Sequence, residues 1–132
     1  MDIMVSHEQG RVPVTVFHVK GDIDGGSYLQ LQTKAHEAFD NGAHNLVIDL
    51  TGVRFMSSAG IRMINDIFKL LRTDAPGESD EAMRQGLKDG TFKSPHLKLV
   101  NPTRNVLDVL KMAGIDMFVE VHRDLKEAMA SF

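Results

Sequence analysis

The sequence predicts an α/β fold, with a mixed, mostly parallel sheet of about five strands, an antiparallel hairpin at its N-terminal edge and about four helices. Two patterns lead to this prediction. Short aliphatic runs alternate along most of the chain with segments whose apolar residues recur every three or four positions, as on one face of a helix. Strands that alternate with helices are usually parallel and joined by right-handed crossovers. The first two apolar runs instead follow each other across the short turn Gln9-Gly10, which is typical of an antiparallel hairpin.

The N-terminal half contains three of the predicted strands and two of the helices. The run VPVTVFHVK is mostly apolar on both faces, so we expect this strand to lie inside a sheet that is covered on two sides. The loop GDIDGG then leads to Ser27, which can cap the first helix, and Gly42 suits the position just after that helix ends. The expected elements are strands at 1–6, 12–20 and 46–50, a helix at 28–41, and a helix from the Ser57-Ser58 turn to residue 72.

The C-terminal half repeats the alternation of strand and helix. Asn101 is a candidate N-cap, with Pro102 at the first helical position, where no intrahelical hydrogen bond is lost. Asp124, with Glu127 three residues later, resembles a capping box at the start of the last helix. The expected elements are strands at 97–100 and 117–121, a helix from 102 that Gly114 ends, and a short helix after 124.

Residues 73–95 interrupt this pattern. They are rich in Gly, Pro, Ser and charged residues and contain few large apolar ones, so we expect an inserted loop with one weak helical turn near 80–87. Neither an internal repeat nor a second hydrophobic unit is evident, and the length predicts a single domain over residues 1–132. Within that domain, the insertion at 73–95 is a candidate element for partner specificity, with disorder as the alternative.

The composition excludes several classes of function. The chain has no Cys, which rules out disulfides, thiolate metal sites and cysteine nucleophiles. The formal net charge is −3, charges of both signs are mixed, and Trp is absent, so no nucleic-acid-binding surface is predicted. No apolar run is long enough to span a membrane, and the first residues do not resemble a signal peptide. We therefore expect a cytoplasmic protein without membrane or nucleic-acid partners.

The residues that could bind a metal or a nucleotide form no recognisable pattern. The loop GDIDGG has neither the G-x-G-x-x-G nor the G-x-x-x-x-G-K-[ST] spacing of phosphate-binding loops. Asp22 and Asp24 have the D-x-D spacing found at the start of a calcium loop, but Thr33 stands where such a loop carries a bidentate Glu. The six His residues are scattered, without the H-x-x-x-H spacing of two ligands on one helix. We expect no metal and no cofactor.

Ser57 and Ser58 lie between the buried strand LVIDL and an amphipathic helix, and three roles are open for them. Either hydroxyl can cap the helix by accepting from a free backbone N–H group. A nucleophilic role has little support because the G-x-S-x-G elbow is absent, so we do not expect an enzyme. Alternatively, a phosphate on Ser58 would place about −1.5 to −2 charges where the helix N-terminus favours an anion. The fold would tolerate that phosphate, whereas a docked partner would meet new bulk and charge.

The stretch VIDLTGVRFMSSAGIRMI, which contains these serines, resembles the signature of the STAS domain family, named for sulfate transporters and anti-sigma factor antagonists. GDIDGGSYLQLQ resembles the family's loop at the start of the first helix, and LKLVNPTRNVLDVLKMAGID resembles its late strand and helix. The resemblance covers nearly the whole chain apart from residues 73–95. It implies a STAS-like fold and a non-enzymatic regulator of the anti-sigma factor antagonist type, acting on transcription through partner switching.

In stand-alone members of this type, a serine kinase that is also the anti-sigma factor phosphorylates one serine, and a PP2C-type phosphatase removes the phosphate. Aligned on Gly60, that serine falls on Ser58. The resemblance implies that the unphosphorylated chain binds the kinase and that phosphorylation disables it. Asp24 matches the loop aspartate that lies near this site in the family. Ser57 stands where an aspartate usually precedes the phosphoserine, and Ala59 replaces the following Ser or Thr, which leaves the partner system open.

Three residues of the second helix are candidates for partner binding. Met63 and Leu70 lie beside its polar stripe and are predicted as exposed apolar anchors near Ser58, with packing at the core edge as the alternative. Arg62 is a candidate cation for an acidic partner face, with plain solvation as the alternative. A second functional hypothesis is a STAS-fold sensor or scaffold that binds a small ligand, or joins a larger assembly, without phosphorylation of Ser58. The sequence predicts no oligomeric state.

Overall fold

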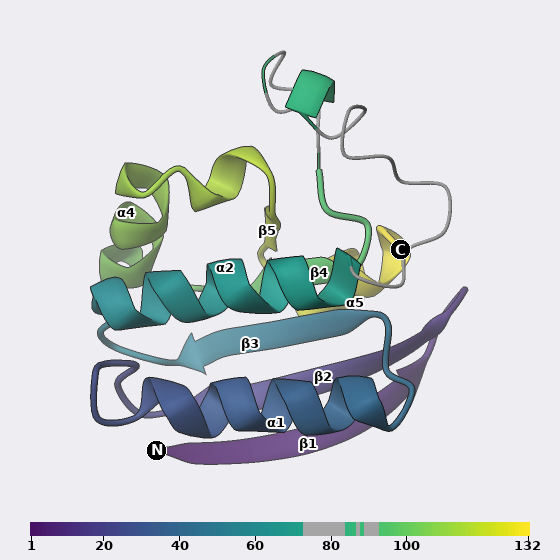
Figure 1. Ribbon diagram of the computed structural model, residues 1–132, viewed down its shortest axis with the longest axis horizontal. Coiled ribbons are helices and arrows are strands. Elements are labelled where there is room, and N and C mark those ends of the chain that lie inside the picture. The colour runs from purple at the N-terminus through teal and green to yellow at the C-terminus, as the bar shows by residue number, and fades with distance from the viewer. Residues whose placement is uncertain (73–83, 87, 89–92) are drawn as a thin grey trace.

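The computed structural model describes residues 1–72, 84–86, 88 and 93–132, and its strands form one mixed sheet (Figure 1). The strands lie in the order β1-β2-β3-β4-β5, where β1 is antiparallel to β2 and every other neighbouring pair is parallel. This arrangement confirms the predicted α/β class and the N-terminal hairpin at one edge. The strands are β1 (Asp2–Gln9), β2 (Pro13–Lys20), β3 (Leu46–Gly52), β4 (Leu97–Val100) and β5 (Glu120–His122).

The helices cover the two faces of the sheet unequally. Side chains of α1, α2 and α4 join the main hydrophobic core on one face, and α1 and α2 lie side by side in Figure 1. The short helix α5 covers part of the opposite face, where Ala128 packs against Val14, Val16, Val47 and Val100 in a second, smaller cluster. The helices are α1 (Tyr28–Asp40), α2 (Ser58–Arg72), α4 (Arg104–Met112) and α5 (Leu125–Ala130), with a 3-10 turn at Ile115–Met117.

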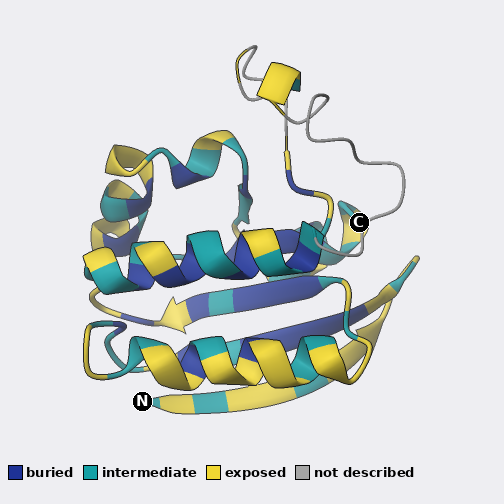
Figure 2. Cartoon of the chain, viewed as in Figure 1, coloured by how far each residue is buried: buried dark blue, intermediate teal, exposed yellow. Residues whose placement is uncertain are grey.

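Burial follows the apolar patterns of the sequence (Figure 2). β3 is buried along most of its length, which confirms that the strand at 46–50 is buried, and its side chains join the hydrophobic clusters on both faces of the sheet. On α2 one stripe is buried, and it includes Ile64, Ile67 and Leu71. β1 is mostly exposed and forms one free edge of the sheet. The short loop 53–57 joins β3 to α2, so the start of α2 lies beside the carboxyl end of this central strand.

Several element boundaries differ from the prediction, and β1, for example, extends to Gln9 rather than ending at residue 6. The helix after β4 begins at Arg104 with Thr103 as its N-cap, because the Val106 amide donates to Thr103 Oγ1 at 3.4 Å. Asn101 instead adopts a left-handed conformation with φ of 48°, and its side chain donates to Thr51 Oγ1 at 3.2 Å. Asn tolerates this conformation better than most residues, and the hydrogen bond of its side chain links the carboxyl ends of β3 and β4. Pro102 therefore lies outside the helix.

The strand expected at 117–121 lies at Glu120–His122 instead. The preceding residues form the 3-10 turn, in which the amides of Phe118 and Val119 both donate to the carbonyl of Ile115. The Phe118 ring packs edge-on against Phe68 of α2, with 4.9 Å between the ring centroids. The final helix does start as predicted, because the Glu127 amide donates to Asp124 Oδ1 at 2.8 Å.

The predicted insertion at 73–95 falls mostly outside the described residues. Residues 84–86 and 88 are helical, which agrees with a short helical turn in this segment. At its C-terminal end, Ser94 is buried and its amide donates to the Phe118 carbonyl at 2.7 Å. The Lys93 ammonium donates to the carbonyls of Asp116 and Met117, at 3.0 Å each. The last residues of the segment are therefore part of the packed domain.

Candidate functional site

The two adjacent serines have different structural roles. Ser57 occupies the N-cap position of α2: its Oγ accepts from the Ala59 amide at 3.2 Å, and its carbonyl accepts from the Ile61 amide at 3.2 Å. Ser58 is the first helical residue and is exposed. Among the described residues, the Ser58 hydroxyl has no hydrogen-bond partner. The structure thus assigns the cap to Ser57 and leaves the Ser58 hydroxyl open to solvent.

The loop that contains Asp24 is held against the serine turn by the backbone. The Ile23 amide donates to the Phe55 carbonyl, the Ser57 amide donates to the Ile23 carbonyl, both at 2.9 Å, and Ile23 forms a parallel bridge with Met56. Asp24 follows Ile23 in the chain and therefore belongs to the loop that pairs with the turn. Its carboxylate accepts from the Gly26 amide at 2.9 Å, so this side chain also orders the loop that leads into α1.

Gly60 is needed for the close packing of the first turn of α2. It is buried, and a Cβ atom at this position would lie 2.5 Å from Met56 Cγ and 2.9 Å from Ile23 Cγ2. Distances this short do not occur between carbon atoms that are not bonded, so any larger residue would push α2 away from the loop. Gly60 therefore fixes where the helix N-terminus, and with it Ser58, sits relative to Asp24.

The residues predicted for partner binding do not all reach the surface. Arg62 is exposed and Leu70 is half-buried, but Met63 is completely buried in the main core, so the prediction of Met63 as an exposed anchor is wrong. The reason is that α2 contacts α1 along its flank as well as the sheet beneath it, which widens the buried stripe beyond the one read from the sequence.

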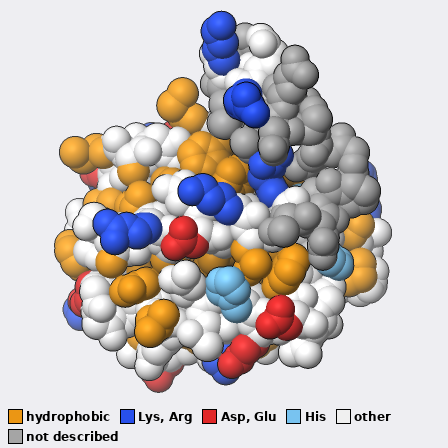
Figure 3. Space-filling model, in the orientation of Figure 1, with side chains coloured by type: hydrophobic (Ala, Val, Ile, Leu, Met, Phe, Trp, Pro, Cys, Tyr) orange, Lys and Arg blue, Asp and Glu red, His pale blue; other side chains and the backbone are white. Residues whose placement is uncertain are grey.

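Phe55 is an exposed apolar residue that the sequence analysis missed. It lies three residues before Ser58 and is 51% exposed, although its neighbours Val53 and Met56 are buried. A large aromatic residue in a short loop beside a polar turn is a signal that the sequence contains. On the face shown in Figure 3, hydrophobic, basic and acidic side chains are interspersed.

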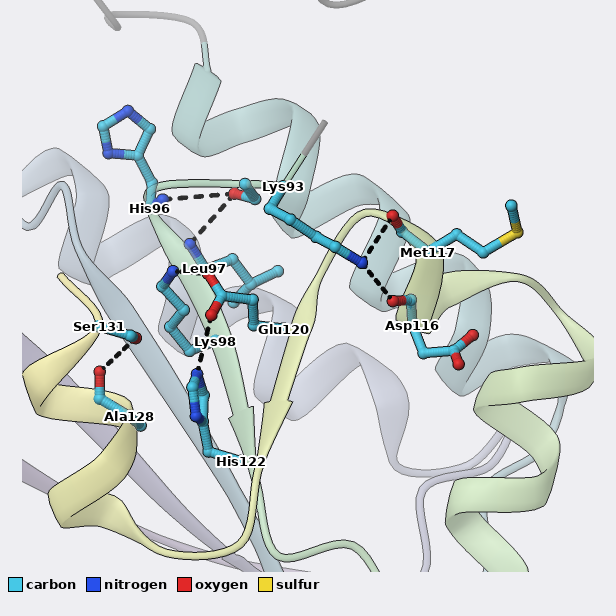
Figure 4. Close-up of polar contacts among 11 residues, drawn as sticks. Lys93, His96, Leu97, Lys98, Asp116, Met117, Glu120, His122, Ala128 and Ser131 are labelled. Carbon is cyan, nitrogen blue, oxygen red and sulfur yellow. Dashed lines mark hydrogen bonds and ion pairs between the residues drawn. The ribbon is translucent and has the colours of Figure 1, made fainter. Parts of the chain in front are cut away.

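A second polar cluster lies between β4 and β5 (Figure 4). The buried Lys98 ammonium is paired with the Glu120 carboxylate, which also lies 3.2 Å from His122 Nε2. The Phe132 ring covers the same ammonium, with its centroid 5.3 Å away. These partners explain how the domain tolerates a lysine that is 2% exposed, since a buried charge must be paired.

Next to this cluster is a cavity of about 530 Å³ between α4 and β5. Its lining includes charged and polar residues of both elements and of the loops around them, and this size suits a small organic ligand. Among the described residues, no group of three or more His, Asp and Glu side chains is arranged to hold a metal ion. The described helices are also too short or too polar to cross a membrane. The lining includes Asn101, Lys111, Glu120, His122 and Arg123.

Solved structures of several bacterial proteins share this fold. An anti-sigma factor antagonist from Mycobacterium paratuberculosis has a TM-score of 0.73 and 18% identity, over 98% of this chain and 92% of that chain. An anti-sigma factor antagonist (STAS) domain protein from Planctomyces limnophilus has a TM-score of 0.70 and 20% identity, over 98% and 95% of the two chains. The Bacillus protein SpoIIAA in its phosphorylated form has a TM-score of 0.62 and 16% identity, over 98% and 97%.

The sequence itself gives an independent result. No curated protein sequence is significantly similar to this chain. Residues 4–75, which run from β1 through α2 and contain the Asp24 loop and the serine turn, match the family model of the STAS domain. Because this match spans more than half of the 132 residues, the chain belongs to the STAS domain family.

Proposed function

We propose that this protein is an anti-sigma factor antagonist-like regulator that binds a cognate serine kinase, itself the anti-sigma factor, and is switched off by phosphorylation of Ser58. The proposal rests on the different structural roles of the two serines in the turn. Ser57 holds the helix cap, whereas Ser58 is exposed with a free hydroxyl among the described residues. A kinase can therefore modify Ser58 without breaking a hydrogen bond of the fold.

Electrostatics supports a phosphate at this position. Ser58 is the first residue of the 15-residue helix α2, so its side chain lies beside backbone N–H groups that have no intrahelical acceptor. The positive end of the helix dipole favours a group that carries about −1.5 to −2 charges. The same charge would be unfavourable for a partner whose surface is shaped for a neutral hydroxyl. Solved structures of SpoIIAA in its unphosphorylated and phosphorylated forms, with TM-scores of 0.58 and 0.62 to this chain, share this fold.

Phe55 and Arg62 are the proposed contacts that surround Ser58. Exposed aromatic and arginine side chains contribute most to protein interfaces, and both residues lie within four positions of the serine. Leu70 adds a half-buried apolar position further along the same helix. In this proposal the protein is not an enzyme and acts in the cytoplasm, and a PP2C-type phosphatase returns it to the binding form.

The test uses the kinase encoded beside this protein's gene, or the one captured from native lysate and identified by mass spectrometry. With ATP, we expect one phosphate on the wild type and on Ser57→Ala, and none on Ser58→Ala. By calorimetry, unmodified Ser58→Ala binds as the wild type does, Phe55→Ala binds about tenfold more weakly, and the phosphorylated protein loses binding. Equal phosphorylation of Ser58→Ala, or unchanged affinity after phosphorylation, would overturn the proposal.

The cavity between α4 and β5 favours a second candidate function, a sensor that binds a small ligand. Lys111, His122 and Arg123 line the cavity and would suit an anionic group on that ligand. A thermal-shift screen with nucleotides and organic phosphates tests this candidate. A shift that disappears in Lys111→Ala, together with unmodified Ser58 in native cells, would support the sensor over the phosphorylation switch.

A further inference from the structure

A chain of hydrogen bonds links Ser6, His18 and Asp49 on the face of the sheet opposite to α1 and α2. Ser6 Oγ lies 3.1 Å from His18 Nε2, and His18 Nδ1 lies 2.9 Å from Asp49 Oδ2. We propose that Ser6 is a reactive serine, activated by His18 and oriented through Asp49, that takes up an acyl group from an activated ester or a phosphonyl group from a phosphonofluoridate. This inference is independent of the role proposed for Ser58.

The register of three neighbouring strands brings these side chains together. His18 on β2 pairs with Asp49 on β3, and on the other side it pairs with Met4 on β1, two positions from Ser6. Residues two apart on a strand share a face, so Ser6 and His18 are diagonal neighbours within reach of each other. All three side chains belong to regular strands of one sheet, which holds them more rigidly than a loop would.

The site is accessible. The side chains of His18 and Asp49 are 32% and 20% exposed, and Ser6 is half-buried. Met4, the neighbour of Ser6 on the same face of β1, is 69% exposed. The helix α5 covers this face around Val14, Val16 and Ala128, which belong to the smaller hydrophobic cluster. A small ester can therefore approach the serine from solvent.

The hydrogen bonds around Asp49 decide where the protons lie. Burial raises the pKa of the Asp49 carboxyl, but hydrogen bonds from the Thr51 hydroxyl, the Thr51 amide and the His18 ring outweigh it and lower that pKa below its usual value. The Thr51 hydroxyl and amide donate to Asp49 Oδ1 at 2.6 and 3.0 Å. An ionised carboxylate only accepts hydrogen bonds, so the nearby Nδ1 of His18 must carry a proton.

In a neutral ring with its proton on Nδ1, Nε2 carries the lone pair and can accept a hydrogen bond from the Ser6 hydroxyl. This is the arrangement of an activated nucleophile: a hydroxyl within hydrogen-bond reach of a base that a third group orients. In the reaction with a phosphonofluoridate, the bond between Ser6 Oγ and phosphorus forms and the P–F bond breaks. Fluoride leaves, and the hydroxyl proton passes to His18 Nε2 and then to water. With an activated ester, the bond between Ser6 Oγ and the carbonyl carbon forms, the bond from that carbon to the alkoxy oxygen breaks, and His18 passes the proton to the leaving alcohol.

The edge position of β1 leaves some of its backbone N–H groups without a strand partner. An antiparallel strand bonds to its neighbour through alternate residues, and β1 has a neighbour on one side only. Either the Ser6 amide or the amides of Val5 and His7 therefore point to solvent at the sheet edge. The inference concerns one transfer to Ser6 and includes no step that would release the group again.

The test is labelling of the full-length protein with a fluorophosphonate probe, followed by intact-mass measurement and peptide mapping. We expect one adduct, on Ser6, and no adduct in Ser6→Ala. In His18→Gln and Asp49→Asn the labelling rate should fall by about a hundredfold or more, which is the usual contribution of a general base and its orientation. His7→Gln is the matched control, because this exposed histidine follows Ser6 on the opposite face of β1, and its rate should equal that of the wild type.

Circular dichroism shows which variants are folded. If His18→Gln does not fold, Asp49→Asn still tests the inference, because asparagine has the same shape as aspartate. The inference is wrong if the wild type gives no adduct, if the adduct lies on Ser58 or another serine, or if folded Asp49→Asn reacts as fast as the wild type. Ser58→Ala should label at the wild-type rate, so this experiment fails or succeeds separately from the phosphorylation tests.

Discussion

The two adjacent serines should differ in what they contribute to stability. Ser57→Ala removes the oxygen that accepts from the Ala59 amide, and leaves that amide without a protein acceptor at the start of α2. Loss of a serine cap usually costs about 1 kcal/mol, within a range of about 0.5–2 kcal/mol. Ser58→Ala removes an exposed hydroxyl that has no partner among the described residues, so its effect should stay within about 0.5 kcal/mol of zero.

Equilibrium unfolding in urea measures this difference. Because the chain has no Trp and only one Tyr, far-UV circular dichroism is a better probe than fluorescence. With a urea dependence of about 1–3 kcal/mol/M, a loss of about 1 kcal/mol lowers the unfolding midpoint by about 0.3–1 M. Ser57→Ala should show this decrease, whereas the midpoint of Ser58→Ala should stay close to that of the wild type.

Ser57→Asp is the control for the cap itself. A carboxylate at the N-cap accepts from the same amide and interacts favourably with the helix dipole, so this variant should keep the wild-type midpoint. Equal losses in Ser57→Ala and Ser58→Ala would refute the reasoning. A larger loss in Ser58→Ala would mean that Ser58 is the cap, and a kinase could then modify it only at the expense of the helix.

Two further predictions concern packing and charge. In Gly60→Ala, crowding against Met56 and Ile23 should lower the free energy of unfolding by about 1–3 kcal/mol, which outweighs the gain of up to about 1 kcal/mol in helix propensity. Thermal unfolding measures this loss. The control Gly25→Ala should unfold at nearly the wild-type temperature, because no neighbouring atom lies within 4 Å of its new Cβ. Because hydrogen bonds lower the pKa of Asp49 below 3.8, its ionised form stabilises the fold above that pH and less as the pH falls through the lowered value. Urea midpoints of the wild type and Asp49→Asn should therefore converge between about pH 6 and about pH 3, and a constant gap would contradict this account.

Local patterns in the sequence were sufficient to predict most of the fold. The aliphatic run at Leu46–Leu50, interrupted only by Asp49, identified a buried strand, because such a run suits a strand covered on both faces. The spacing of Ile64, Ile67 and Leu71 identified α2, and Asp124 with Glu127 identified the start of α5. These signals depend on interactions between residues close in sequence, so they can be read without knowing how the chain folds. The serine turn was also found in this way, because a strand, two hydroxyls and a helix follow one another directly.

The sequence by itself therefore determined the order of strands and helices and the position of the serine turn, whereas contacts between distant segments decided the roles of individual side chains. The pairing of Ile23 with Met56 makes glycine necessary at position 60 and places Asp24 beside the turn. The packing of α1 against α2 buries Met63 and corrects the surface predicted for a partner. The register of β1, β2 and β3 joins Ser6 to His18 and Asp49, which are 12 and 43 residues away in the chain. No local pattern contains these contacts, because sheet register and helix packing are set by the whole chain at once.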